Sequence, residues 1–168
     1  IIAGYEFVEP DRTASVADYF FDAEKGFFYD RKLKGGDFVK VEGCEAYIPF
    51  WTQIATPEQA KAVLPYFTDP LKVSTYMTAD HPQFSPNGYW RGPIWLDQVY
   101  FGIRGLRNYG YAQLADDYTK RVFDRLNGLR GDAPIHENYE TNTGKRLKSP
   151  HFSWSAAHLL MLYREAGV

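Results

Sequence analysis

The sequence has little of several features that mark particular classes of protein. It holds one cysteine, Cys44, which excludes a disulfide within the chain and leaves the redox compartment open. Lysine and arginine form no runs and the net charge is −2, which argues against electrostatic capture of nucleic acid. No apolar run approaches the length that spans a membrane. We therefore expect neither nucleic acid nor a membrane as a partner.

Motifs for phosphate, metal and thiol chemistry are missing as well. The chain has no glycine-rich phosphate loop, no pair of cysteines and no Gly-x-Ser-x-Gly elbow. Four histidines are present without the spacing of metal ligands: His81, His136, His151 and His158. We expect no metal ion and no cofactor in this segment. His158 is predicted to be a hydrogen-bonded histidine of the core.

The first residues, Ile1 to Gly4, contain neither an initiator methionine nor a signal peptide. A processed chain and a piece of a longer chain both fit, and we favour the piece. The composition is that of a globular protein, with 45% apolar and 24% charged residues. The aromatic content of 17% is high, with 13 tyrosines and 4 tryptophans. Such rings fill cores and also line sugar and nucleobase sites.

The stretch from Pro86 to Tyr111 organises the rest of the chain. A loop of glycine, proline and aromatic residues, 89–93, leads into a segment, 94–109, that is apolar on nearly every side. A helix of that kind must be covered all round, so we predict an inner helix. The loop and the first two residues after it place two tryptophans, a tyrosine and an arginine where backbone N–H groups point outward. We expect a pocket for a flat, hydroxyl-rich ligand there.

Apolar residues at helical spacing predict helices at five further places: 11–22, 41–55 (buried and interrupted early by Pro49), 56–67, 111–127 and 153–165. The fourth is one-sided and predicts an outer helix, whereas the last is apolar nearly all round and predicts an inner one. Residues 22–30 predict a short hairpin or extended loop, and 71–93 and 128–152 predict irregular structure. Without a strand-rich region, residues 1–168 predict a single all-α segment of inner helices covered by outer helices.

Several carboxylates lie among aromatic residues and are candidates for acid–base chemistry: Glu42, Glu45, Asp80, Asp97 and Glu137. Glu137 lies in the long loop ahead of Gly144, where a rigid frame would hold it over a pocket with access to water. A solvated loop glutamate is the competing interpretation. Asp97 shares a helix stripe with Arg104 and Asn108, which favours a buried polar network over catalysis.

Two residues of the aromatic loop carry a separate expectation. Trp90 is the tryptophan that we expect to face a pocket, whereas tryptophans elsewhere are more often part of a core. Arg91 fits two roles equally well, the binding of ligand hydroxyls and the holding of a carboxylate.

Three motifs in order resemble the C-terminal part of glycoside hydrolase family 63: residues 89–95 with 105–111, Glu137-Asn138-Tyr139 with Gly144, and residues 152–158. That family includes processing α-glucosidase I, mannosylglycerate hydrolases and bacterial α-glucosidases, and the bacterial α-glucosidases are the most similar. The resemblance is strong over 86–163 and looser over 27–69. Trehalases share part of the first motif but lack its Tyr-Trp-Arg-Gly-Pro form.

The resemblance implies the C-terminal portion of an (α/α)6 barrel in an inverting hydrolase of α-linked glucosides or oligosaccharides. The family's general base maps onto Glu137, whereas its general acid is an aspartate from an upstream stretch that this sequence lacks. We therefore expect the isolated chain to be inactive and to require the rest of the enzyme as its partner. The residues expected to border the sugar are Tyr89, Trp90, Arg91, Trp95, Tyr139, Trp154 and Glu45. A calcium site would lie outside this segment, and a periplasmic or secreted location is favoured.

Two other classes of function stay open. A non-catalytic sugar-binding or structural segment of such a barrel would carry the same motifs, and a parent or partner chain with the acid would distinguish the enzyme from it. A helical ring around an apolar pocket, as in terpene-processing enzymes, predicts a dry cavity without paired carboxylates. The polar stretch from Glu137 to Tyr139 argues against that second class.

Overall fold

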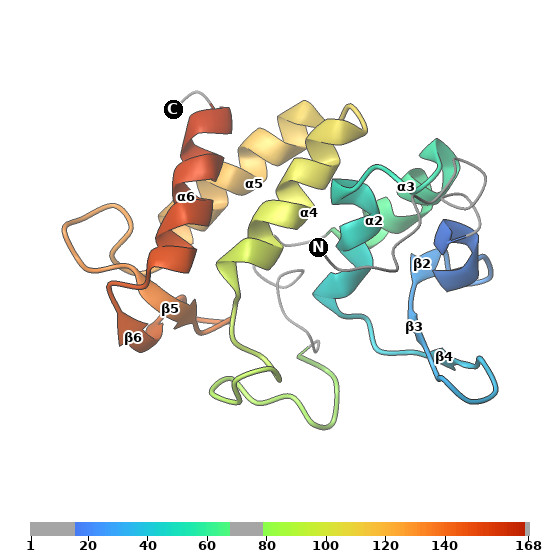
Figure 1. Cartoon of the computed structure of the whole chain (residues 1–168). Coiled ribbons are helices and arrows are strands. Elements are labelled where there is room, and N and C mark those ends of the chain that lie inside the picture. Colours follow the sequence, from blue (N-terminus) through green and yellow to red (C-terminus); the bar gives the residue numbers. More distant parts are fainter. Residues whose placement is uncertain (1–15, 68–78, 167–168) are drawn as a thin grey trace, which may run out of the picture.

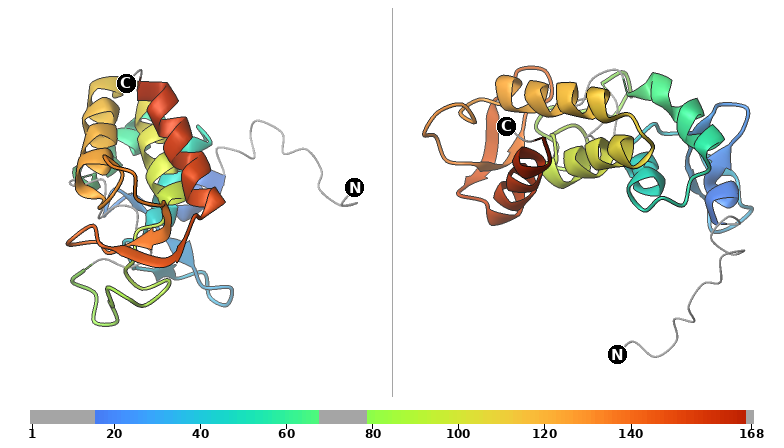
Figure 2. Two further views of the ribbon diagram at one scale, coloured as in Figure 1. Left: turned by 90° about the vertical axis from the view of Figure 1, so that its left-hand side faces the viewer. Right: turned by 90° about the horizontal axis from the view of Figure 1, so that it is seen from above.

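The computed structural model describes residues 16–67 and 79–166, and its helices lie in two layers (Figure 1, Figure 2). Three helices form one layer: α2 (Ile48–Trp51), α4 (Leu96–Asn108) and α6 (Ser153–Ala166). Two helices form the other: α3 (Pro57–Val63) and α5 (Ala112–Arg125). Short 3-10 helices adjoin α2 and α3: η1 (Cys44–Tyr47) and η2 (Leu64–Tyr66). Among the described residues, no helix is long and apolar enough to cross a membrane.

The described part of the chain also holds three small antiparallel sheets, which corrects the expected all-α class. Each sheet has two strands: β1 (Phe21–Asp22) with β2 (Phe27–Phe28), β3 (Asp30–Arg31) with β4 (Phe38–Val39), and β5 (His136–Tyr139) with β6 (Arg146–Pro150). The first pair confirms the predicted hairpin at 22–30. The third lies within 128–152, where irregular structure was predicted. Its signal is weak because most of β6 is exposed and its side chains do not alternate in hydrophobicity.

Helix α4 is the centre of the core, as the apolar stretch predicted. It packs against α2, α5 and α6, and most of its residues are buried. Gly105 permits the close approach of α2, because a Cβ at this position would overlap Phe50. The helix begins at Leu96 rather than at residue 94, since Ile94 pairs with Tyr139 in an isolated β-bridge.

Local signals explain the other helix boundaries. Thr56 and Gln59 form the predicted capping box at the start of α3, with the Gln59 N–H donating to Thr56 Oγ1 at 3.2 Å. The helix predicted over 41–55 is wrong in extent. It is divided into η1 and the four-residue α2, because Pro49 lacks an N–H and restricts the residue before it.

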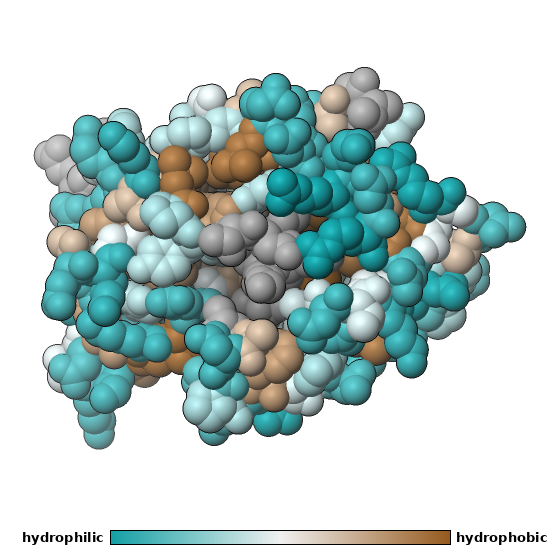
Figure 3. All heavy atoms as spheres, turned by 180° about the vertical axis from the view of Figure 1, so that it is seen from behind, coloured by the Kyte–Doolittle hydropathy of each residue, from teal (hydrophilic) through white to brown (hydrophobic). Residues whose placement is uncertain are grey.

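The polar and apolar side chains on the surface are distributed differently over the two helix layers. α5 buries one stripe and is an outer helix as predicted, and hydrophilic side chains predominate on the side of α3 and α5 (Figure 3). α6 is not covered all round within the described structure. Its apolar residues Leu160, Met161 and Tyr163 are exposed, because α6 lies at the edge of its layer and contacts α4 and α5. α6 nevertheless shares the layer of α4, as predicted for an inner helix.

Two of the predicted segments extend beyond the described residues. Of the helix predicted over 11–22, residues 11–15 lie outside the described residues, 16–20 are helical, and the chain turns into β1 at Phe21. Of the irregular stretch 71–93, residues 71–78 lie outside the described residues, and 79–93 form neither helix nor strand.

Candidate active site

A tightly hydrogen-bonded loop presents the aromatic residues that the sequence singled out. The Ser85 N–H donates to the Arg91 carbonyl at 2.7 Å, and the Gly88 N–H donates back to the Ser85 carbonyl at 2.9 Å. Gly92 is needed because a Cβ there would run into the carbonyl oxygen of Ser85. The loop therefore holds Tyr89 at its tip by backbone bonds.

Four aromatic side chains, which we call the aromatic wall, gather where this loop meets the layer of α4 and α6: Tyr89, Trp90, Trp95 and Trp154. Trp90 stacks on Trp95 with ring centroids 4.3 Å apart and an angle of 11°, and Tyr89 lies edge-on to both rings. Trp154 lies 6.1 Å from Trp95. Trp95 is only 3% exposed, whereas Trp90 is 50% and Trp154 47% exposed. The wall thus has a buried base at Trp95 and an accessible surface at Trp90 and Trp154.

Glu137 lies beside this wall and is fixed from two sides. The Tyr89 hydroxyl donates to Glu137 Oε1 at 2.8 Å, and the buried Ser155 hydroxyl donates to the Glu137 carbonyl at 3.0 Å. The hydrogen bond to the carboxylate raises the pKa of Tyr89, so the phenol stays a donor. Glu137 itself is half-buried in β5. A carboxylate with a fixed partner and partial exposure is a suitable proton acceptor.

The residues after Glu137 join its hairpin to the start of α4. The Ile94 N–H donates to the Tyr139 carbonyl at 2.7 Å, the Asn138 amide donates to the Ile94 carbonyl at 3.4 Å, and Thr141 Oγ1 bonds the Gly92 carbonyl. Tyr139, which we expected to border the sugar, is fully buried. This placement corrects that expectation, and Tyr139 supports the site from within the core.

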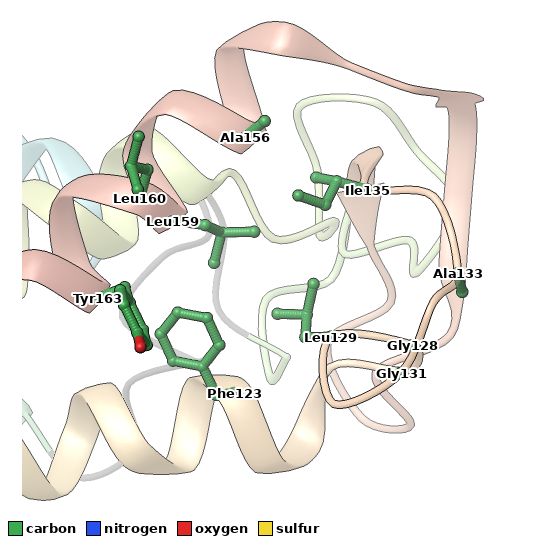
Figure 4. A pocket seen from close by; sticks show the side chains of 10 residues that line it. All are labelled: Phe123, Gly128, Leu129, Gly131, Ala133, Ile135, Ala156, Leu159, Leu160 and Tyr163. Carbon is green, nitrogen blue, oxygen red and sulfur yellow. The ribbon is translucent and has the colours of Figure 1, made fainter. Parts of the chain in front are cut away.

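Apolar packing secures the chain that enters β5. Leu129 and Ile135 face Leu159 of α6 and Phe123 of α5 across a cavity of about 290 Å³ (Figure 4). No charged side chain lines this cavity, so it lacks the groups that sugar chemistry requires. The apolar side chains around it pack the segment before β5 against α5 and α6.

Glu45 is not part of the aromatic wall. It lines a different cavity of about 240 Å³ together with residues of β2, α2 and the helical segment 16–20. Glu45 Oε2 is buried without a hydrogen-bond partner among the described residues. Burial raises the pKa of Glu45, and the nearby charge of Asp30 adds to the effect. The structure therefore separates Glu45 from the other predicted sugar contacts.

Other polar predictions have simpler outcomes. Arg91 is exposed and donates to the Gln83 carbonyl at 3.5 Å. The network expected along α4 does not form, since Asp97 bonds Gln98, Arg104 pairs with Glu165, and Asn108 bonds the carbonyls of Phe50 and Trp51.

His158 is half-buried rather than a core residue, because α6 lies at the edge of its layer. Its Nδ1 lies 2.9 Å from the Trp154 carbonyl, one helical turn earlier, and its ring packs on Tyr100 and Phe101.

The sequence profile described as "Mannosylglycerate hydrolase MGH1-like glycoside hydrolase domain" matches residues 11–155. The chain belongs to this branch of glycoside hydrolase family 63. It is 28% identical to a mannosylglycerate hydrolase of Rubrobacter radiotolerans over 87% of this chain and 34% of that protein. It is 31% identical to mannosylglycerate hydrolase MGH1 of Selaginella moellendorffii over 88% of this chain and 30% of that protein. The chain thus spans about a third of these relatives' length.

The fold agrees with this assignment. The GH63 mannosylglycerate hydrolase of Thermus thermophilus, solved in complex with glucose, superposes with a TM-score of 0.70 at 23% identity, over 90% of this chain and 38% of that one. The relatives named here are mannosylglycerate hydrolases. The finer expectation of an α-glucosidase therefore has no support from them.

Three residues that hold the candidate site together were not predicted from the sequence: Thr141, Lys148 and Ser155. Ser155 lies in the quoted motif 152–158, so the motif contained a signal that was not used. Thr141 and Lys148, whose Nζ donates to the Asn87 carbonyl at 3.4 Å, carry no comparable signal, because their contacts arise from the unexpected hairpin. Within the described ranges, no three potential ligands gather as a metal site would require.

Proposed function

We propose that this chain is the general-base-bearing portion of an inverting glycoside hydrolase and forms part of an (α/α)6 barrel. The observation that carries the proposal is the half-buried Glu137, fixed by Tyr89 beside an accessible aromatic wall. Tyr89 engages one carboxylate oxygen, so the other, Oε2, is the proton acceptor in this proposal. Trp90 and Trp154 offer flat apolar surfaces for the C–H faces of a sugar ring.

The reaction in this proposal needs a second carboxyl group. An inverting hydrolase uses one carboxylic acid to protonate the leaving oxygen, while a carboxylate on the opposite face activates water, about 6.5–9.5 Å away. Glu137 takes the proton from water as the oxygen attacks the anomeric carbon. The acid is an aspartate of the portion that the relatives have beyond the matched third. That portion is therefore the expected partner of residues 1–168.

The substrate in this proposal is an O-glycoside of a hexose. The names of the relatives favour mannosylglycerate over the α-glucosides and oligosaccharides that the sequence led us to expect. We retain α-glucosides as the second candidate, because the resemblance of the aromatic loop and the Glu137 motif suggested them. Absence of a cofactor here, a calcium site elsewhere and a periplasmic or secreted location stay predictions.

A substrate panel tests this proposal. A form of the enzyme that includes the remaining portion is given mannosylglycerate and α-glucosides, and proton NMR follows the anomeric configuration of the first product. We expect hydrolysis with inversion, because water attacks opposite the leaving group. Retention would contradict Glu137 as the base. Binding of the sugars without hydrolysis would support the alternative, a non-catalytic sugar-binding or structural segment.

A further inference from the structure

The hairpin that carries Glu137 has an irregularity directly opposite this residue. His136 pairs with Pro150 and Asn138 pairs with Leu147. One residue, Glu137, therefore lies opposite two residues of β6, Lys148 and Ser149. This is a β-bulge, an arrangement that bends a strand and changes the direction of nearby side chains.

The bulge contains a residue, Lys148, whose backbone conformation is unfavourable for a lysine. Lys148 has a φ of 59°, in the left-handed region that only a few per cent of residues other than glycine occupy. Such a conformation persists where the surroundings hold it in place. The bulge is therefore held by contacts that offset an unfavourable backbone geometry.

His136 clamps the bulge, and a contact of Lys148 reaches the neighbouring loop. His136 Nδ1 lies 3.2 Å from the Leu147 carbonyl and 3.2 Å from the Lys148 carbonyl. Both partners only accept, so Nδ1 carries the proton and donates to the bulge. Lys148 Nζ donates to the Asn87 carbonyl at 3.4 Å and thus joins the bulge to the loop that carries Tyr89. The exposed Lys148 therefore links the hairpin that carries Glu137 to the loop that carries Tyr89.

We propose that the left-handed bulge at Lys148, which His136 clamps, positions Glu137 toward Tyr89. The importance of the bulge for catalysis rests on the proposed function of Glu137. The bulge itself is a property of the hairpin and is tested without turnover.

The test measures the Tyr89–Glu137 contact in the whole chain. Tyrosine labelled with ¹³C at Cζ is incorporated, and the resonance of Tyr89 is assigned by its loss in Tyr89→Phe. As acid is added this resonance is expected to shift in one step when the carboxyl group beside it takes up a proton, since the hydroxyl donates to that group. Glu137→Gln removes the step and thereby defines its origin.

Substitutions at Lys148 then decide the proposal. Lys148→Gly and Lys148→Asn accept a positive φ and are expected to keep the full step, although both lose the exposed Nζ contact to the Asn87 carbonyl. Lys148→Val disfavours that conformation, and its step is expected to fall to less than half. A full step in Lys148→Val would overturn the proposal, as would its loss in Lys148→Gly.

A second pair of variants decides the matter if Lys148→Val does not fold. His136→Phe keeps a flat ring but loses the Nδ1 donor, and we expect the step to fall. His136→Asn returns an N–H donor near the position of Nδ1 and is expected to restore it. An unchanged step in His136→Phe would overturn the proposal that His136 holds the bulge. If Glu137 were not the base, all these chemical-shift changes would stay the same. Failure of the proposed function can therefore be distinguished from failure of the bulge proposal.

Discussion

Two glutamates that the sequence placed in one site occupy very different surroundings. Glu137 accepts a hydrogen bond from Tyr89, and its carbonyl accepts one from Ser155. Glu45 lines a separate cavity, has a buried carboxylate oxygen without a partner among the described residues, and has a raised pKa because of burial. Polar partners fix a carboxylate in its charged form, whereas burial without them opposes the charge. The comparison shows that Glu137, unlike Glu45, has a hydrogen-bond donor on its carboxylate beside the aromatic wall.

Tryptophan truncations in the aromatic wall are expected to give the largest effect on stability. Trp95→Ala removes a 3% exposed side chain and is predicted to lower the free energy of unfolding by about 3–5 kcal/mol. Trp90→Ala removes its half-exposed stacking partner and is predicted to cost about 1 kcal/mol. Urea denaturation followed by circular dichroism measures both. Equal losses would show that the wall has no division into a buried base and an accessible surface.

Glu45→Gln is expected to stabilise the protein at pH 7 by about 1–2 kcal/mol, because it removes a buried charge without a full set of partners. The folded pKa lies above the unfolded value of 4.5, so the protonated form is the one that folding favours. Stability from this group is present below pH 4.5 and is lost as pH rises through the folded pKa.

The gain from Glu45→Gln should therefore disappear near pH 4, where the wild-type carboxyl group is largely neutral. Urea denaturation at pH 4 and pH 7 measures the difference. A loss of stability at pH 7 would mean that Glu45 has partners that compensate its charge. Glu45 and Glu137 would then not differ in having partners for their carboxylates.

Ser155→Ala is expected to have the smallest effect, a loss of about 1 kcal/mol, since a buried hydroxyl no longer satisfies the Glu137 carbonyl. Thr52→Val serves as the control, because the Thr52 hydroxyl bonds the Ile48 carbonyl at an exposed position. Chemical denaturation compares the two variants. An equal loss in Thr52→Val would show that the position of Ser155 beside Glu137 has no special value.

The sequence predicted those parts of the fold that depend on local or periodic signals. The apolar stretch that became α4, the Thr56 capping box and the amphipathic α5 each follow from residue types at fixed spacing. The hairpin β5–β6 could not be predicted in this way, because its pairing rests on backbone bonds and on a bulge between segments with little hydrophobic alternation.

The candidate site was predictable to a similar degree. Glu137, Tyr89 and Trp90 lie together, as the motifs indicated. Tyr139 and Glu45 were expected beside them because motif order says nothing of which way a side chain faces. Whether a residue lines the wall or lies in the core depends on tertiary packing, which for Tyr139 includes the bridge to Ile94.

The role of Glu137 is tested most directly by the turnover of Glu137→Gln in the form that includes the remaining portion. The amide keeps the shape of the side chain and can accept from Tyr89, but it lacks the basic oxygen. We expect kcat to fall about 10²–10⁴-fold while KM changes little. Glu24→Gln, at an exposed position, is the control and should leave kcat unchanged. A kcat within about threefold of the wild type would contradict the assignment of Glu137 as the general base.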